Sequence, residues 1–231
     1  FISIMNTTTS NSPNNTSLAS KDMDLQYLIR EPKGKSVKKK ALVLLHGVGS
    51  NEQDLFTLAD QLPADFYIIS IRGQFTLGPD MYAWYQVDFS SGKPVFNADQ
   101  ELSSREMIQQ FVKQIKHKYQ LDEVYLGGFS QGAIMSYTIG LTLPTEISGI
   151  ISLGGRVLED IQGTIIPNDA LKQLKVFIAH GVQDGTLPVH YARTAKKFME
   201  TLGVQLSYHE YQMGHQINLD VLADLSKWLG S

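Results

Sequence analysis

The chain has 231 residues, of which 42% are hydrophobic and 19% are charged, and its formal net charge is −3; these values are typical of an ordinary globular protein with a substantial core. The nearly balanced charge argues against a nucleic-acid partner, and no apolar run reaches the ~18–20 residues of a membrane span, so we expect no nucleic-acid binding and no stable membrane insertion. Cysteine is absent, which excludes disulfides, thiolate metal sites and a cysteine nucleophile and fits a cytoplasmic location.

The first twenty residues are rich in Asn, Ser and Thr, which bury little apolar surface. We therefore predict a flexible tail over 1–20 and a single domain over 21–231. The opening Phe-Ile-Ser-Ile-Met is too short for a signal peptide and has no basic flank. Export stays open, because a chain that begins with Phe1 can be a truncated one.

Strand and helix patterns alternate along the rest of the chain. This alternation predicts a mostly parallel central sheet with helices on both faces, in which ligands bind beyond the carboxyl ends of the strands. In chain order, the predicted elements are strands at 25–31 and 41–47, a helix at 52–62, a strand at 66–71, a helix at 101–119, a strand at 124–128, a helix at 131–141, strands at 147–155 and 174–181, a helix at 191–203, a strand at 204–211 and a helix at 217–230.

A long segment without clear periodicity, 72–100, separates the third strand from the second helix. Aromatic-rich loops of this length in a compact domain are more often functional than idle. We therefore expect an apolar substrate pocket, although Trp84 and Tyr85 could equally pack the loop onto the body of the protein. The predicted pocket side chains are Phe75, Leu77, Met81, Trp84, Tyr85 and Phe89, with Leu187 from elsewhere in the chain.

A serine stands between two glycines where a predicted strand meets a predicted helix, in the pattern Gly128-Phe-Ser130-Gln-Gly132. A sharp strand-to-helix turn exposes the serine hydroxyl at the top of the sheet, and a β-carbon at either glycine would collide with that turn. The following helix places its positive N-terminal end at the same point. The pattern predicts that Ser130 is a nucleophile.

An acid and a histidine follow in the order that this chemistry requires. Asp184 comes after the strand at 174–181, and His215 lies between the last strand and the last helix. The chain order Ser130, Asp184, His215 is that of the α/β-hydrolase triad. We therefore predict a catalytic triad of these three residues, whereas His180, at the end of a strand, is expected to have a packed and hydrogen-bonded role.

A second strand-to-helix junction carries His46-Gly47-Val48. Hydrolases with this organisation place one half of the oxyanion hole on such a turn, and the residue after the nucleophile supplies the other half. The predicted donors are the backbone N–H groups of Val48 and Gln131. The alternative for His46-Gly47 is a plain turn between a strand and a helix.

Six segments together resemble the carboxylesterase/phospholipase family, which also contains acyl-protein thioesterases. They are LLHGVGSNEQDL (44–55), IRGQ (71–74), WYQVD (84–88), GFSQGAIMS (128–136), HGVQDGTLPV (180–189) and MGHQI (213–217), and the resemblance covers about 24–230. It implies a small α/β-hydrolase fold with little or no lid, acting on carboxylic esters or thioesters without a metal or organic cofactor. Two departures, Asp184-Gly-Thr-Leu-Pro188 in the acid loop and Gly132-Ala133 after the elbow, leave the substrate open.

The predicted function is therefore that of a serine hydrolase of the carboxylesterase/phospholipase type, which cleaves esters of short to medium acyl chains through an acyl-enzyme on Ser130. Its partner would be a small-molecule or lipid ester, and a homodimer is possible. Two alternatives remain. The protein could be an acyl-protein thioesterase or lysophospholipase that acts at membranes, or a non-catalytic binding protein on a hydrolase scaffold.

Overall fold

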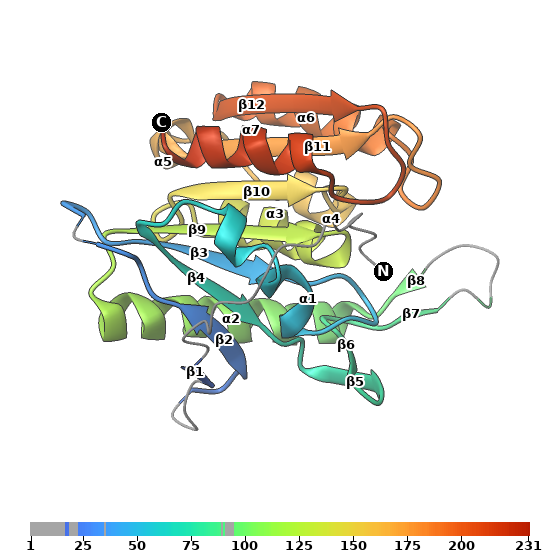
Figure 1. Cartoon of the computed structure of the whole chain (residues 1–231). Helices are drawn as coiled ribbons and strands as arrows, with labels where there is room; N and C mark the ends of the chain where they lie inside the picture. The colour runs from blue at the N-terminus through green and yellow to red at the C-terminus, as the bar shows by residue number, and fades with distance from the viewer. Residues whose placement is uncertain (1–16, 19–22, 35, 89, 91–94) are drawn as a thin grey trace.

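The computed structural model describes residues 17–18, 23–34, 36–88, 90 and 95–231. An eight-stranded sheet forms the centre of the molecule, in the order β1-β2-β4-β3-β9-β10-β11-β12 (Figure 1). The strands from β4 to β12 in that order run parallel, whereas β2 is antiparallel to β4 and β1 to β2. Their bounds are β1 Ser17–Leu18, β2 Tyr27–Arg30, β3 Lys40–Leu45, β4 Phe66–Ile71, β9 Glu123–Phe129, β10 Gly149–Leu153, β11 Lys175–Gly181 and β12 Gln205–Tyr211.

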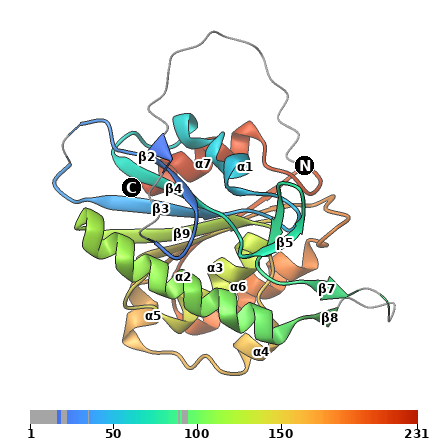
Figure 2. The same ribbon diagram turned by 90° about the horizontal axis from the view of Figure 1, so that it is seen from below.

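Helices cover both faces of the sheet (Figure 2). One face packs against α2, α3 and α6, and the other against α1 and α7, and each face has its own cluster of buried apolar side chains. The helix bounds are α1 Glu52–Phe56, α2 Ala98–Tyr119, α3 Gln131–Thr142, α4 Glu159–Gln162, α5 Asp169–Gln173, α6 His190–Leu202 and α7 Leu219–Leu229, with a 3₁₀ turn, η1, at Ala59–Gln61. The predicted parallel sheet with helices on both faces is confirmed.

The alternation of side chains along β3 shows why the sheet needs two covers. Ala41, Val43 and Leu45 belong to the cluster under α2, α3 and α6, whereas Leu42 and Leu44 belong to the cluster under α1 and α7. A strand that is apolar on both sides reads as a continuous apolar run, because successive side chains point to opposite faces.

Successive strands are added on opposite sides of β3, at the centre of the sheet. From β3 the chain passes to β4 on one side and then returns to β9 on the other, so that β3 and β9 are neighbours with divergent connections. The loops that follow two such strands leave a crevice at their carboxyl ends, which is where ligands bind in open parallel sheets. The loop after β3 carries His46 and Val48, and the turn after β9 carries Ser130.

The segment 72–100 is more regular than its sequence indicates. It contains two antiparallel hairpins, β5 Phe75–Gly78 with β6 Met81–Ala83 and β7 Val87–Asp88 with β8 Val95–Phe96, and both stand at one end of the sheet (Figure 1). The prediction of an irregular loop was wrong because strands of two to four residues are too short to show a period.

Two further differences concern element boundaries. The predicted helix over 52–62 is the short α1 followed by η1. Ser17–Leu18, inside the predicted tail, pair with β2, and the rest of that tail, like Phe89, lies outside the described residues. Among the described residues, no helix combines the length and the apolar character that crossing a membrane requires.

Candidate active site

Ser130 lies on a tight turn between the end of β9 and the first residue of α3. Its backbone has φ 55° and ψ −115°, a conformation that costs free energy for any residue other than glycine and that gathers at functional sites. The flanking glycines make the turn possible, because a β-carbon on Gly128 would overlap Gly132, and one on Gly132 would overlap the carbonyl of Leu45. The geometry agrees with the nucleophile elbow that the sequence predicts.

The structure brings Ser130, His215 and Asp184 into one hydrogen-bonded chain, although 54 and 31 positions separate them in sequence order (184 − 130 and 215 − 184). The Ser130 hydroxyl lies 2.9 Å from Nε2 of His215, and Nδ1 of His215 lies 2.7 Å from Oδ2 of Asp184. The carboxylate accepts only, so Nδ1 carries the proton and Nε2 is left to accept from the serine hydroxyl. This is the tautomer that a general base requires.

The loop after β11 holds the buried carboxylate in place. Oδ1 of Asp184 accepts the backbone N–H groups of Thr186 and Leu187 at 2.9 and 2.8 Å, which leaves Oδ2 for His215. Nε2 of His180 lies 2.7 Å from the Leu187 carbonyl and 3.4 Å from Oδ2 of Asp184, within a fully buried environment. His180 therefore has the packed, hydrogen-bonded place that its position in the strand indicates.

Close backbone contact joins the acid loop to the histidine loop. A β-carbon on Gly181 would overlap the carbonyl oxygens of Met213 and Gly214, and the N–H of Gln183 donates to the Met213 carbonyl at 3.1 Å. Glycine at 181 thus lets the loop that carries His215 approach the loop that carries Asp184.

The two backbone donors predicted for an oxyanion lie on neighbouring loops. Gln131 is the first residue of α3, where helix N–H groups have no partner within the helix. A β-carbon on Gly47 would lie 3.5 Å from Cβ of Ser130, which places the loop of Val48 beside the nucleophile. Neither N–H donates a hydrogen bond to another residue that the structure describes.

The ring of His46 holds the loop that carries Val48 through two hydrogen bonds. The ring is fully buried, Nδ1 lies 2.7 Å from the Gly47 carbonyl, and Nε2 accepts the backbone N–H of Gly73 at 2.9 Å. Burial lowers the pKa of His46 below its usual value. A neutral ring, with the proton on Nδ1, satisfies both hydrogen bonds, so His46 is a structural residue of the loop.

An ion pair and a backbone bridge also hold the loop that carries Val48. Arg72 forms a bidentate pair with the buried Glu52 at 2.6 Å for each contact, and its guanidinium lies 4.5 Å from the ring centre of Tyr82. Tyr82 in turn pairs with Ser50 through the backbone, and its carbonyl accepts the N–H of Gly49 at 2.8 Å. The hairpin of β5 and β6 is therefore fastened to the turn that carries Val48.

An apolar groove of about 720 Å³ is lined by Val48 and by residues of the two hairpins. Of the seven side chains predicted for the pocket, Leu77 lines this groove and Phe89 lies outside the described residues. The other five are not among the lining residues: Phe75, Met81, Trp84, Tyr85 and Leu187. Its lining residues are Val48, Leu77, Gln86, Val87, Asp88, Val95, Phe96 and Asn97.

The predicted pocket residues have separate places in the structure. Trp84 and Tyr85 are 1% and 2% exposed and belong to the core, so they pack the segment onto the body of the protein instead of facing a ligand. Met81 is exposed on β6 and lies beside Gly49, whereas Phe75 is partly buried on β5. Leu187 is partly buried in the acid loop, where its N–H holds Asp184.

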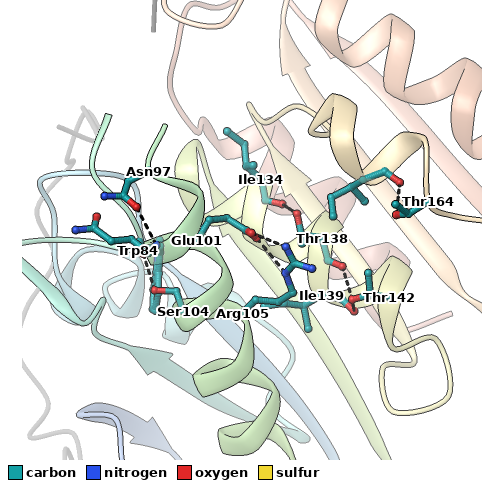
Figure 3. Close-up of polar contacts among 12 residues, drawn as sticks. Trp84, Asn97, Glu101, Ser104, Arg105, Ile134, Thr138, Ile139, Thr142 and Thr164 are labelled. Carbon is teal, nitrogen blue, oxygen red and sulfur yellow. Dashed lines mark hydrogen bonds and ion pairs between the residues drawn. The ribbon is translucent and has the colours of Figure 1, made fainter. Parts of the chain in front are cut away.

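Sequence inspection missed a set of buried hydrogen bonds around Trp84. Its indole N–H donates to the His46 carbonyl, and its backbone N–H donates to the side chain of Gln131. Its carbonyl accepts the hydroxyl of Ser104 (Figure 3). The motif WYQVD draws attention to Trp84, but only the tertiary structure supplies these partners. Among the described residues, no group of three or more His, Asp or Glu side chains could hold a metal ion.

Comparison with known proteins gives consistent results. The family model described as phospholipase/carboxylesterase matches residues 28–231. Acyl-protein thioesterase 1 of Kluyveromyces lactis is 28% identical over 209 residues, which cover 83% of this chain and 91% of that protein.

Solved structures give the same fold. The carboxylesterase of Mesorhizobium loti superposes with a TM-score of 0.79 at 20% identity, covering 94% of this chain and 100% of that one. Esterase PE8 superposes with a TM-score of 0.75 at 25% identity, covering 89% of this chain and 98% of that one. The predicted α/β-hydrolase fold is confirmed, and because the family model matches most of its length, the chain belongs to the phospholipase/carboxylesterase family.

Proposed function

We propose that the protein is a serine esterase that forms an acyl-enzyme on Ser130. One observation carries the proposal: the hydrogen-bonded chain from Ser130 through His215 to Asp184, which lies at the carboxyl ends of the strands on a strained turn. Membership of the phospholipase/carboxylesterase family supports it.

The geometry supports a two-step mechanism. Nε2 of His215 takes the proton of the Ser130 hydroxyl as its oxygen attacks the ester carbonyl, while Asp184 stabilises the imidazolium that forms. The N–H groups of Val48 and Gln131 receive the negative oxygen of the tetrahedral intermediate, and the N-terminal end of α3 favours the same charge. His215 then returns the proton to the leaving alcohol, and in the second step it activates the water that releases the acid.

The groove that Val48 lines supports a proposal for the substrate class. Leu77, Val87, Val95 and Phe96 offer apolar contact to a chain that leaves the reaction centre, and an open groove of this kind accepts an acyl group of short to medium length. We therefore propose carboxylic esters with such acyl chains as substrates. A cytoplasmic location, the absence of stable membrane insertion and a homodimer stay predictions.

Thioester hydrolysis is a second candidate, because the relative from Kluyveromyces lactis is an acyl-protein thioesterase. The same residues serve either reaction, since an acyl-enzyme forms from an oxygen ester or a thioester alike. The choice depends on the leaving group, which a comparison of p-nitrophenyl butyrate with butyryl-coenzyme A and an S-butyryl-cysteine peptide measures directly.

The test of the proposal is hydrolysis of a p-nitrophenyl ester series from C2 to C12 by the full chain and by Ser130→Ala. The variant is expected to lose about 10⁴-fold or more in kcat, because removal of a triad nucleophile leaves only binding and the oxyanion donors. Stoichiometric labelling of Ser130 by a fluorophosphonate would identify the nucleophile. A folded wild-type protein that neither turns over any ester or thioester nor reacts with the fluorophosphonate would contradict the proposal in favour of a binding protein.

A further inference from the structure

Trp84 contacts both loops that carry the proposed oxyanion donors. Its indole N–H donates to the His46 carbonyl at 2.9 Å, and its backbone N–H donates to Oε1 of Gln131 at 2.8 Å. The other end of the same amide is also used, because Nε2 of Gln131 donates to the Tyr85 carbonyl at 2.7 Å. We call His46, Trp84 and Gln131 the oxyanion clamp.

The clamp is buried and its hydrogen bonds are complete. His46, Trp84 and Gln131 are 0%, 1% and 4% exposed. The third polar group of Trp84, its carbonyl, accepts the hydroxyl of Ser104 on α2 at 2.5 Å (Figure 3). Because buried polar groups without a partner are costly, such a network has one favourable arrangement and resists displacement of any member.

Each contact of the clamp acts close to a proposed donor. The His46 carbonyl belongs to the turn that presents the N–H of Val48 two residues later, and Gln131 itself provides the second N–H. The two loops also meet directly at Gly132, where a β-carbon would overlap the backbone of Leu45 and His46. Trp84 adds a second link between them through its hydrogen bonds to the His46 carbonyl and the Gln131 side chain, so the backbone on either side of the crevice is held at two points.

An oxyanion hole depends on such fixed spacing. The donors act when they lie ~2.7–3.1 Å from the developing oxyanion, and they act strongly because they need not reorganise during the reaction. A shift of a fraction of an ångström in one loop would lengthen one of the two hydrogen bonds to the transition state while leaving the ground-state ester almost unaffected.

We propose that Trp84 and the side chain of Gln131 are positioning residues that set the separation between the N–H groups of Val48 and Gln131. The inference rests on the proposed esterase function and deepens it. Trp84 touches no substrate, because its side chain is buried, and the Gln131 side chain is used entirely by Trp84 and Tyr85.

The experiment compares Trp84→Phe and Gln131→Met with the wild-type chain. Trp84→Phe keeps an aromatic ring in the core and removes the hydrogen bond to His46, whereas Gln131→Met keeps the backbone N–H and side-chain length and removes both amide hydrogen bonds. Thr138→Val is the matched control: its buried hydroxyl also lies on α3 but bonds only to Ile134 of the same helix (Figure 3). The readouts are kcat and KM for p-nitrophenyl butyrate, the inhibition constant of butylboronic acid, and the melting temperature.

The expected result is a fall in kcat of about 10-fold for Trp84→Phe and about 10–100-fold for Gln131→Met, less than the ~10²–10³ that loss of a whole donor costs. KM should stay within about twofold, and the affinity for the boronic acid, whose adduct is tetrahedral, should fall in parallel with kcat/KM. The double variant should lose less than the product of the two single losses, since both act on one spacing.

Several results would overturn the inference. They are variants that keep kcat within twofold of wild type despite a lower melting temperature, a loss confined to KM, or an equal loss of kcat in Thr138→Val. If Gln131→Met does not fold, Ser104→Ala removes the hydroxyl that supports the Trp84 carbonyl, while Gln74, which also donates to that hydroxyl, keeps its hydrogen bond to Ser103. This variant should still lower kcat about 3-fold with KM unchanged. A wild-type protein without acyl-enzyme formation would instead refute the proposed function, and the inference with it.

Discussion

The turn at Ser130 and the segment between β4 and α2 reach the same end of the sheet by different physical means. The turn depends on the absence of two β-carbons. Only glycine fits at positions 128 and 132, because the neighbouring backbone segments are in van der Waals contact there. The segment 72–97 is built from two short hairpins with exposed apolar side chains, and it is held to the body by the Arg72–Glu52 pair and the hydrogen bonds of Trp84.

The two regions therefore have different roles in the proposed active site. Reacting groups need positions that are accurate to a fraction of an ångström, and the ends of packed parallel strands provide them. The proposed substrate contacts tolerate more variation, and they lie on the hairpins, where Leu77 and Val95 line the groove. Trp84 connects the two regions, since its side chain lies in the core while Gln86 and Val87, two and three residues later, line the groove.

The largest effect is expected at the reacting groups at the strand ends. Asp184→Asn should lower kcat by about 10⁴-fold, because the amide neither stabilises the imidazolium nor enforces the tautomer of His215. The fold should persist, since the amide oxygen can still accept the N–H groups of Thr186 and Leu187. Ester hydrolysis and circular dichroism check both statements, with the exposed Asp169→Asn on α5 as the control.

Gly132→Ala tests whether the turn is held by exclusion. The added methyl group would overlap the Leu45 carbonyl, so we expect a loss of roughly 1–3 kcal/mol in the free energy of unfolding together with most of the activity. Gly163→Ala, where the nearest atom would be 3.8 Å away, should change neither. Urea unfolding followed by fluorescence measures the stability, and equal effects at the two glycines would contradict the steric account.

Leu77→Ser tests whether the hairpins provide apolar contact to the acyl chain. Removal of an exposed apolar side chain from the groove should lower kcat/KM for an octanoyl ester about 10-fold, the equivalent of ~1.4 kcal/mol of apolar contact, and should leave the acetyl ester within twofold. The chain-length profile of p-nitrophenyl esters is the measurement. Ile166→Ser changes an even more exposed side chain outside the groove lining and should leave that profile unaltered.

The last prediction concerns the Arg72–Glu52 ion pair, which joins the two regions, and it depends on pH. Burial alone would raise the pKa of Glu52, but the hydrogen bonds and charge of Arg72 outweigh it and the net pKa is lowered. A carboxyl with a lowered pKa in the folded state contributes stability above its unfolded value of about 4.3, and this contribution is lost as pH falls through the folded pKa. Glu52→Gln should therefore cost roughly 1–3 kcal/mol at pH 7.

Thermal unfolding of wild type and Glu52→Gln between pH 3 and pH 7 checks this prediction. The difference in stability between the two proteins should shrink as pH falls below about 4.3 towards the lowered pKa of the folded Glu52 carboxyl. A difference that stays constant across this range would mean that the Arg72–Glu52 pair does not hold the hairpin through its charge.

Much of the site could be predicted from the sequence, because its physical causes are local. Three local features are visible as patterns in consecutive residues. They are a glycine where a β-carbon would overlap the backbone, an apolar run that is buried on both faces, and the order of the junctions after successive strands. From these patterns the parallel sheet, the turn at Ser130 and the placement of Asp184 and His215 at strand ends could be expected before their proximity was seen. Their catalytic roles stay predictions until the variants are measured.

The remaining features were decided by tertiary structure. An aromatic residue in a loop has the same sequence pattern whether it faces a ligand or the core, and only the packing of 72–97 against α2 and α3 buried Trp84 and Tyr85 and left Leu77 exposed. The strands in that segment are too short to show a period, and the partners of Trp84 lie 38 and 47 positions away. The amino-acid sequence by itself thus determined where the reacting groups stand along the chain, whereas long-range contacts decided which side chains form the groove and which hold the two loops together, because burial depends on what packs from elsewhere.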